Sequence, residues 1–279
     1  MSLDRIRLAS LHDKVMNAEQ AAAFIQDGMT VGMSGFTRAG EAKAVPLALV
    51  KRAKADPLKI TLITGASLGS DLDKQLTEAG VLARRLPFQV DNTLRKAINK
   101  GEVMFIDQHL SETVEQMRNK QLKKPDIAVI EAVAITEDGG IIPTTSVGNS
   151  ASFAIFAEKV IVEINTNLSP AFEGLHDIYI PSYRPTRQPI PLTEVDERIG
   201  TQAINIDPSK IVGIVINSEF HDSPSTVTEP DDETQGIANH LIAFFEKEVA
   251  EDRLPKNLGP LQAGIGSIAN AVLTGLKDS

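Results

Sequence analysis

Short runs of apolar and β-branched residues alternate along the chain with segments whose apolar residues recur at helical spacing. Six of these runs have the length and composition of β-strands. Several are almost continuously apolar, as expected for strands that are covered on both faces. The predicted strands are Thr30–Gly35, Ile60–Gly65, Val103–Asp107, Ile127–Ile135, Lys159–Asn165 and Ile211–Ser218.

Helical patterns occupy the intervals between these strands. Lys43–Ala55 has Pro46 in its first turn, where a proline is tolerated, and stops before Pro57. Glu233–Glu248 is the strongest pattern and follows an acidic start. The other predicted helices are Glu19–Asp27, Leu72–Gly80, Thr93–Lys100, Glu112–Lys120 and Ala151–Glu158. This alternation predicts an α/β fold with a mostly parallel sheet and helices on both faces.

Three segments break the alternation and bear on the domain organisation. Pro181–Pro191 holds four prolines, which excludes a regular helix or a central strand there. Asp222–Pro230 is a loop of serine, threonine and proline, and Arg253–Pro260 has the composition of a connector. We therefore expect an N-terminal α/β domain over residues 1–252. Residues 253–279 are expected to form a connector and the start of a second domain.

Composition narrows the classes of function. The net charge is −9 and the sequence pI about 5.1, which argues against binding of nucleic acid or of an anionic membrane through a basic surface. The absence of cysteine excludes disulfides, thiolate metal sites and a cysteine nucleophile. The five histidines are scattered, so we predict no metal site. Because no run suits a transmembrane helix or a secretory signal, we expect a cytoplasmic protein.

Four turns rich in glycine or serine follow predicted strands or open a helix, which is where α/β proteins bind ligands. They are Ser34–Gly40, Gly65–Gly69, Thr145–Ser150 and Gly264–Gly266. The last turn leads directly into a pattern of small apolar residues, so its backbone N–H groups are expected at the positive end of a helix. Such groups hold phosphates, carboxylates or oxyanions. Each turn taken singly is also explained by tight packing.

The residues alone leave two further classes of function open. A phosphate-binding α/β enzyme, such as a sugar-phosphate isomerase, would need a lysine or arginine beside Gly264, and none flanks it. A non-catalytic ligand-binding module needs only the turns. None of the four turns matches the dinucleotide-binding or P-loop pattern.

In chain order, five motifs together resemble the acetyl-CoA hydrolase/transferase family, which are class I CoA-transferases and include succinyl-CoA:acetate CoA-transferases. The motifs are Ser34–Thr37, Gly65–Gly69, Ser146–Ser150, Glu173–Asp177 and Gln262–Gly266. The resemblance runs from about Gly28 to Gly275. It implies two similar α/β halves with the active site between them, of which this chain is the N-terminal half.

The chemistry that the resemblance implies is transfer of CoA from an acyl-CoA to a small carboxylate such as acetate or succinate. A glutamate attacks the thioester, an acyl-glutamyl anhydride forms, and CoA thiolate converts it to a glutamyl-CoA thioester. A second carboxylate completes the cycle, or water in an acetyl-CoA hydrolase. We expect the glutamate beyond Ser279, so no catalytic residue is assigned and this fragment alone is expected to be inactive. No permanently bound cofactor is implied, and the full-length protein is expected to be a homodimer.

The resemblance also implies roles for individual residues. The residues expected to bind CoA and the oxyanion are Gln262, Ala263, Gly264, Ile265 and Gly266. The candidates for binding substrate are Ser67, Ser34, Gly35, Phe36, Thr37, Ser146, Val147, Gly148 and Asn149. The structural alternatives are a glycine turn, a strand-end cap and an Asn/Gly turn before the next helix.

Two remaining groups of polar residues have simpler explanations. Glu173, His176 and Asp177 could form a catalytic cluster, but we expect them to organise the loop before the proline-rich segment. Arg184 and Arg187 could meet an anionic partner, whereas a solvated loop is the commoner explanation for such residues.

Overall fold

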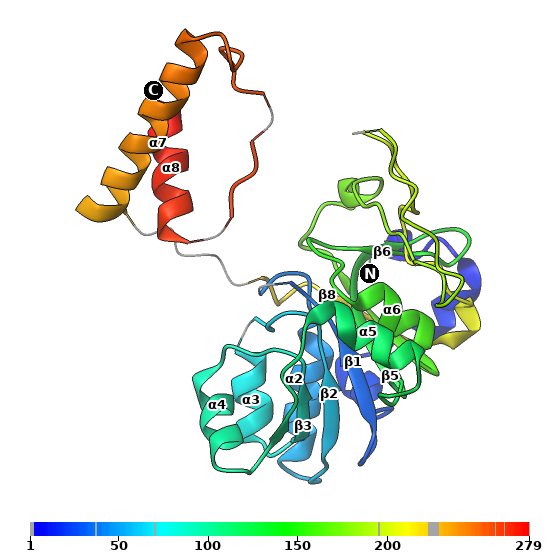
Figure 1. Cartoon of the computed structure of the whole chain (residues 1–279). Coiled ribbons are helices and arrows are strands. Elements are labelled where there is room, and N and C mark those ends of the chain that lie inside the picture. The colour runs from blue at the N-terminus through cyan, green and yellow to red at the C-terminus, as the bar shows by residue number, and fades with distance from the viewer. Residues whose placement is uncertain are drawn as a thin grey trace. The chain divides into compact units, whose positions relative to one another are not determined.

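The chain forms an α/β sheet followed by a pair of helices (Figure 1). A computed structural model describes residues 3–36, 38–69, 71–194, 196–222, 229–259, 261–264 and 266–278. Its contacts divide the chain into two compact units, Met1–Ser223 and Pro224–Ser279, and each is described by itself.

The first unit contains one sheet in which seven strands follow the order β4-β3-β2-β1-β5-β7-β8. All six pairings along this order are parallel, and β6 pairs antiparallel with β5. The strands are β1 (Thr30–Met33), β2 (Ile60–Ile63), β3 (Leu82–Leu86), β4 (Met104–Phe105), β5 (Ile127–Ile135), β6 (Ile141–Pro143), β7 (Lys159–Asn165) and β8 (Ile211–Asn217). The predicted α/β fold with a mostly parallel sheet is confirmed.

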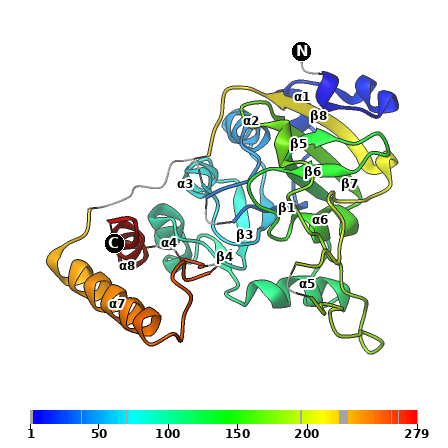
Figure 2. The same ribbon diagram turned by 90° about the horizontal axis from the view of Figure 1, so that it is seen from above.

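Helices cover both faces of this sheet, as predicted (Figure 2). The helices of the first unit are α1 (Ala18–Ala22), α2 (Ala44–Ala53), α3 (Leu72–Glu78), α4 (Asn92–Asn99), α5 (Leu110–Arg118) and α6 (Ser150–Phe156). Successive residues of β5 enter different cores. Ile127 and Val129 pack with α1 to α4, whereas Ala128 and Ile130 pack with α5 and α6. This alternation explains why all nine residues of β5 are buried.

Two strands of the sheet, β3 and β6, were not predicted from the sequence. In β3, Arg84 and Arg85 interrupt the apolar run, yet Arg85 is fully buried because Asp73 of α3 accepts hydrogen bonds from its Nε and Nη2 at 2.8 and 3.0 Å. The second strand, β6, has only three residues and ends in Pro143. A buried ion pair and a three-residue strand leave no periodic signal.

The second unit pairs α7 (Asp232–Ala250) with α8 (Ser267–Asp278). Asp231 begins α7 with a capping box, because its carboxylate accepts the Thr234 N–H at 2.8 Å. The predicted helix after the final glycine turn is confirmed, since α8 starts directly after Gly266. The predicted domain boundary between residues 252 and 253 stays a prediction. The contacts group α7 with α8 in the unit that begins at Pro224.

Candidate functional site

Three of the predicted turns come together around the point where the strand order reverses. β1 lies between β2 and β5, so its carboxyl end is the switch point at which open α/β sheets bind ligands. The Asn149 N–H donates to Ser34 Oγ at 2.8 Å, and its side-chain amide donates to the Thr64 carbonyl at 3.4 Å. Ser150 Oγ donates to the Ser34 carbonyl at 3.4 Å. The turn before α6 is thereby joined to the turns after β1 and β2.

Glycine is required at two of these positions by the closeness of the turns. A Cβ at Gly65 would lie 2.6 Å from Ser34 Oγ, and one at Gly148 would lie 2.5 Å from the same atom. Gly148 also has a φ of +49°, a conformation that side chains other than glycine rarely adopt. The turns can therefore meet around Ser34 only because both positions lack a side chain.

The other predicted substrate residues around these turns have distinct environments. Ser146 Oγ donates to the Ala39 carbonyl at 2.7 Å, so that hydroxyl joins two loops. Ser67 is buried, and its carbonyl accepts the Arg38 N–H at 3.4 Å. Val147 is partly buried against the apolar core. These contacts show how the loops are held, and a role in binding substrate stays a prediction for each.

Phe36 lies in an exposed position among the predicted substrate residues. Its side chain is 55% exposed and lines a cavity of about 690 Å³ together with Ala66, Phe88 and His109. A cavity of this size accommodates a small organic ligand. Gly35, beside Phe36, has no room for a Cβ, which would lie 2.7 Å from the Ala39 carbonyl oxygen.

The predicted CoA- and oxyanion-binding turn belongs to the second unit. Gln262, Ala263 and Gly264 are exposed, and the Asn270 N–H donates to the Gly266 carbonyl at 3.1 Å in the first turn of α8. Gly266 has a φ of +116°, so its backbone conformation requires glycine. Of the remaining predicted site residues, Thr37 and Ile265 lie outside the described residues. The role of this turn stays a prediction.

A buried network of charged groups lies beneath the joined turns. The Lys43 ammonium is fully buried and donates to the Glu41 carbonyl at 2.6 Å and to Glu131 Oε1 at 2.8 Å. It also pairs with Asp222 Oδ1 at 2.8 Å. Asp222 in turn accepts the hydroxyl of Thr145 at 3.0 Å. The network therefore connects the start of α2 and β5 to the turn before α6.

The side chain of Glu163, in β7, caps the N-terminus of α2. Its Oε1 accepts the N–H groups of Lys43 and Ala44, both at 2.9 Å, and its Oε2 accepts that of Val45 at 3.1 Å. A carboxylate at the N-terminus of a helix satisfies free N–H groups and is favoured by the helix dipole. Burial raises the pKa of Glu163, while the three backbone hydrogen bonds oppose that rise.

Glu41 is the one carboxyl of this network with an unsatisfied oxygen among the described residues. Its Oε1 accepts the Gly69 N–H at 3.0 Å, whereas its Oε2 is buried and has no hydrogen-bond partner there. Burial raises the pKa of Glu41 to about 7, although the nearby Lys43 ammonium opposes the rise. The carboxyl lies against Gly35 and Gly69, in the turns after β1 and β2. The Glu41 carboxyl therefore loses its proton as the pH rises from mildly acidic to neutral values.

This pKa predicts a pH dependence of stability that Glu41→Gln should remove. The folded state raises the pKa of Glu41 from an ordinary 4.5 to about 7, so between these values it binds a proton that the unfolded chain has released. The free energy of unfolding contributed by this group therefore falls as pH rises from 4.5 to 7. Between pH 5 and pH 8 the loss is about 2–3 kcal/mol. Urea unfolding of both proteins at the two pH values measures it. An equal pH dependence in Glu41→Gln would contradict the assignment.

Sequence reasoning missed the whole network of Glu41, Lys43, Glu131, Glu163 and Asp222. A usable signal was present in two of these positions. Glu131 and Glu163 interrupt runs of apolar residues in strands predicted to be covered on both faces. A carboxylate in such a position must find buried partners. The partner of both carboxylates is Lys43, which lies about 90 positions from Glu131 and about 120 from Glu163. A local sequence pattern does not span such separations.

The residues of the Glu173–Asp177 motif make structural contacts. Glu173 forms a double hydrogen bond with Arg7, at 2.6 and 2.8 Å. A ring nitrogen of His176 lies 3.1 Å from the Pro143 carbonyl. Asp177 accepts the N–H groups of residues 199 and 200. These contacts agree with the expectation that the motif organises its loop.

Two kinds of feature are absent from the described part of the chain. It contains no group of three or more histidine, aspartate or glutamate side chains placed to hold a metal ion. It also contains no helix with the length and apolar character needed to cross a bilayer.

The sequence of residues 2–216 matches the family model of the acetyl-CoA hydrolase/transferase N-terminal domain. The chain belongs to the acetyl-CoA hydrolase/transferase family. The match covers all three joined turns and the whole sheet except Asn217, the last residue of β8. The sequence resemblance drawn from the five motifs is thereby confirmed.

Curated members of this family are similar to the chain over almost all its length. A succinyl-CoA:acetate CoA-transferase of Clostridium kluyveri is 46% identical over 99% of the chain and 51% of its own length. An acetyl-CoA hydrolase of Kluyveromyces lactis is 43% identical over 99% of the chain and 54% of its own length. The chain therefore spans about half the length of these acetyl-CoA hydrolase/transferase relatives.

Solved structures share the fold at low sequence identity. RipA from Yersinia pestis superimposes with a TM-score of 0.63 at 20% identity, over 96% of the chain and 55% of that protein. Glutaconate coenzyme A-transferase from Acidaminococcus fermentans superimposes with a TM-score of 0.51 at 15% identity, over 88% of the chain and 93% of that protein. These likenesses support the family's α/β fold.

Proposed function

We propose that the chain is the N-terminal part of an acyl-CoA:carboxylate CoA-transferase that works through a glutamyl-CoA thioester. The observation that carries this proposal is the 46% identity to a succinyl-CoA:acetate CoA-transferase over 99% of the chain. The acyl donors are of the acetyl-, propionyl- or succinyl-CoA class, and the acceptor is a small carboxylate. The nucleophilic glutamate lies beyond Ser279, and the full-length protein is a homodimer.

The joined turns would supply the acyl end of this site. They stand at the switch point of the sheet, beside a cavity of about 690 Å³ that Phe36 lines. Within them, Ser34, Ser67, Ser146 and Asn149 are the polar groups that we assign to substrate binding. A carboxylate nucleophile needs a closely held and oriented thioester, because it is a weak nucleophile in water.

The Gln262–Gly266 turn would stabilise the oxyanion and hold CoA. The space around its glycines is open, since Cβ atoms at Gly264 and Gly266 would meet nothing within 4 Å. Backbone N–H donors stabilise the tetrahedral intermediate formed when a thioester is attacked. Gln262, Ala263, Gly264 and Gly266 are exposed, which agrees with a site that another part of the full-length protein completes.

Hydrolysis of acetyl-CoA is the second candidate function, because relatives named acetyl-CoA hydrolase are 41–43% identical to the chain. Hydrolysis and transfer would share the glutamyl-CoA thioester and differ in whether water or a carboxylate attacks it. Product analysis separates them. A transferase releases acetate from acetyl-CoA in step with succinyl-CoA formation from succinate, whereas a hydrolase releases free CoA without an acceptor.

Mass spectrometry after incubation with acetyl-CoA tests the proposed mechanism. The 279-residue chain is expected to carry no covalent CoA, and the polypeptide extended by its gene beyond Ser279 should carry one CoA on a glutamate of the extension. Borohydride should reduce that thioester to an alcohol with release of CoA, which marks the modified glutamate by the change in its mass. A CoA adduct within residues 1–279 would contradict the placement of the nucleophile. An extended polypeptide without adduct or turnover would favour a non-catalytic ligand-binding protein.

A further inference from the structure

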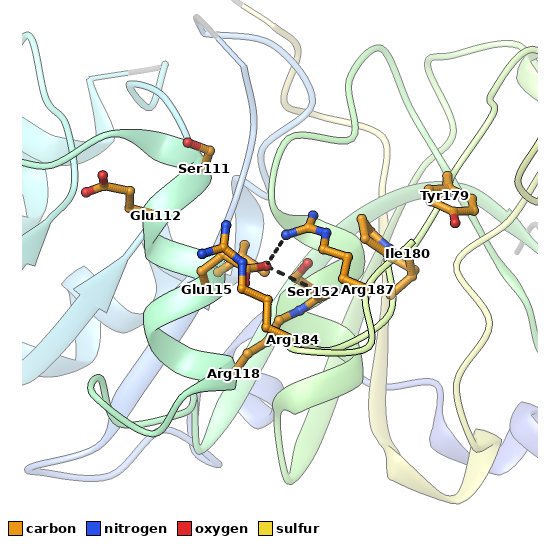
Figure 3. A pocket seen from close by; sticks show the side chains of 11 residues that line it. Ser111, Glu112, Glu115, Arg118, Ser152, Tyr179, Ile180, Arg184 and Arg187 are labelled. Carbon is orange, nitrogen blue, oxygen red and sulfur yellow. Dashed lines mark hydrogen bonds and ion pairs between the residues drawn. The ribbon is translucent and has the colours of Figure 1, made fainter. Parts of the chain in front are cut away.

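A second cavity, of about 510 Å³, lies between α5, α6 and the proline-rich segment (Figure 3). Its basic wall consists of Arg118 from the end of α5 and of Arg184 and Arg187 from the proline-rich segment. Ser152 of α6 and Tyr179 also line it. Neither the joined turns nor the cavity beside Phe36 includes these five residues.

The three arginines converge on a single carboxylate, that of Glu115. Its Oε1 accepts Arg187 Nη1 at 3.1 Å and Arg118 Nη1 at 3.3 Å, and Arg184 Nε lies 3.9 Å from its Oε2. Figure 3 shows the carboxylate of Glu112, which also lines the cavity, directed away from these guanidinium groups. Three positive charges around the Glu115 carboxylate leave a local excess of two beside it, and an excess of one over the whole cavity lining when Glu112 is counted. This local excess occurs in a chain whose net charge is −9.

Arg118 provides an independent sign of a missing acceptor. The residue is only 8% exposed, and its Nε is buried without a hydrogen-bond partner among the described residues. The guanidinium also lies over the ring of Tyr183, 5.3 Å from the ring centroid. A buried guanidinium donor without an acceptor is costly, and stacking on an aromatic ring does not satisfy an N–H group. The side chain is thus held between Glu115 and the ring of Tyr183, and its Nε–H has no acceptor among the described residues.

We propose that this cavity binds a doubly charged oxyanion of the phosphate class, carried as free phosphate or as a phosphomonoester. Two negative charges balance the excess left by Glu115. Guanidinium groups match the oxygens of phosphate in a two-bond geometry and are less strongly hydrated than ammonium groups. The serine hydroxyl of Ser152 is a further donor. Tyr179 and Ile180 form an apolar wall, and the cavity exceeds the size of phosphate alone, which favours an organic phosphomonoester.

Calorimetric titration of the 279-residue chain tests this site with three probes: inorganic phosphate, phenyl phosphate and benzoate. Phenyl phosphate and phosphate should bind, and benzoate, a single charge on a similar ring, should bind at least about tenfold more weakly. Tighter binding of phenyl phosphate than of phosphate identifies a phosphomonoester site, and equal binding identifies a free-phosphate site. Both outcomes support the proposal.

Variants separate this cavity from other basic surfaces. Arg184→Gln with Arg187→Gln should weaken phosphate binding by about tenfold or more, because each removes a charged donor. Glu115→Gln should strengthen it, because the competing carboxylate is lost. Arg95→Gln, on the exposed face of α4, is the control and should change nothing. Both Arg184 and Arg187 lie on an irregular segment, and circular dichroism checks that the fold is retained.

Three results would contradict the proposal that this cavity binds a phosphate group. One is the absence of saturable binding of both phosphate probes. Another is binding that the double arginine variant leaves unchanged. The last is weaker phosphate binding in Glu115→Gln, since that would make Glu115 a support of the site rather than a competitor for its donors. None of these results depends on CoA transfer, so the proposal stands or falls separately from the proposed function.

Discussion

Replacement of Lys43 by methionine is expected to lower the free energy of unfolding by about 3–5 kcal/mol. The ammonium is the positive centre of the buried network, held by Glu131 and Asp222 at 2.8 Å. Burial by itself lowers the pKa of Lys43, but these carboxylates and Glu41 more than offset that effect and raise it. Without the ammonium, the buried carboxyls of Glu41 and Glu131 and the partly buried carboxyl of Asp222 would have no cation beside them. Urea unfolding of Lys43→Met at neutral pH measures the loss.

The matched control lies on α2, the helix that Lys43 precedes. Lys51 of α2 pairs with Glu19 at 3.3 Å, but its side chain is 77% exposed. Surface pairs of this kind contribute less than about 1 kcal/mol, so Lys51→Met should unfold close to the parent protein. Similar losses for the two variants would mean that the buried network has no special energetic role.

Gly65→Ala is expected to destabilise the protein by about 1–3 kcal/mol and to lower any acyl-CoA turnover of the longer polypeptide. The new Cβ would lie 2.6 Å from Ser34 Oγ and 3.2 Å from the Gly35 carbonyl oxygen, so the turns after β1 and β2 must move apart. The φ of Gly65 is not in the left-handed region, so the expected cost is steric rather than conformational. Thermal unfolding and kcat measurements check the two effects.

A double variant tests whether Ser34 causes this cost. Removing Oγ with Ser34→Ala makes room for the new Cβ, although it leaves the Asn149 N–H without its acceptor. The cost of Gly65→Ala should therefore be smaller in the Ser34→Ala background than in the parent. Gly236→Ala in α7 is the control, because its Cβ would meet nothing within 4 Å and alanine favours helix. Additive effects of Gly65→Ala and Ser34→Ala would contradict a clash at Oγ.

Most of the sheet could be predicted because its signal is local. A strand such as Ile127–Ile135 is apolar at every position except Glu131, and a helix such as α4 begins at a side chain that caps it, here Asp91 accepting the Leu94 N–H at 2.8 Å. β3 could not be predicted in the same way. Its Arg85 is acceptable in the core only because Asp73 of another element pairs with it.

For the candidate site, the turns could be predicted from the sequence, but the contacts that join them could not. The order of the glycine- and serine-containing turns was enough to indicate the acetyl-CoA hydrolase/transferase family. It also indicated that the turns following β1 and β2 belong to a site. The cause of their contact was not visible, because it depends on Ser34 Oγ meeting Gly65 and Gly148, residues about 30 and 110 positions away. The arginines of the proline-rich segment had an ordinary explanation in the sequence, a solvated loop.

Local patterns along the chain are enough to establish the α/β class, most strands and helices, and membership of the family, because periodicity, caps and ordered motifs are properties of neighbouring residues. Three features emerge only in the folded chain: burial of Glu41 raises its pKa to about 7, Lys43 is the centre of the acidic network, and Arg118, Arg184 and Arg187 meet around Glu115. The physical reason is that burial and charge pairing depend on distances through space. Segments far apart in the chain set those distances only when the sheet and its helices pack together.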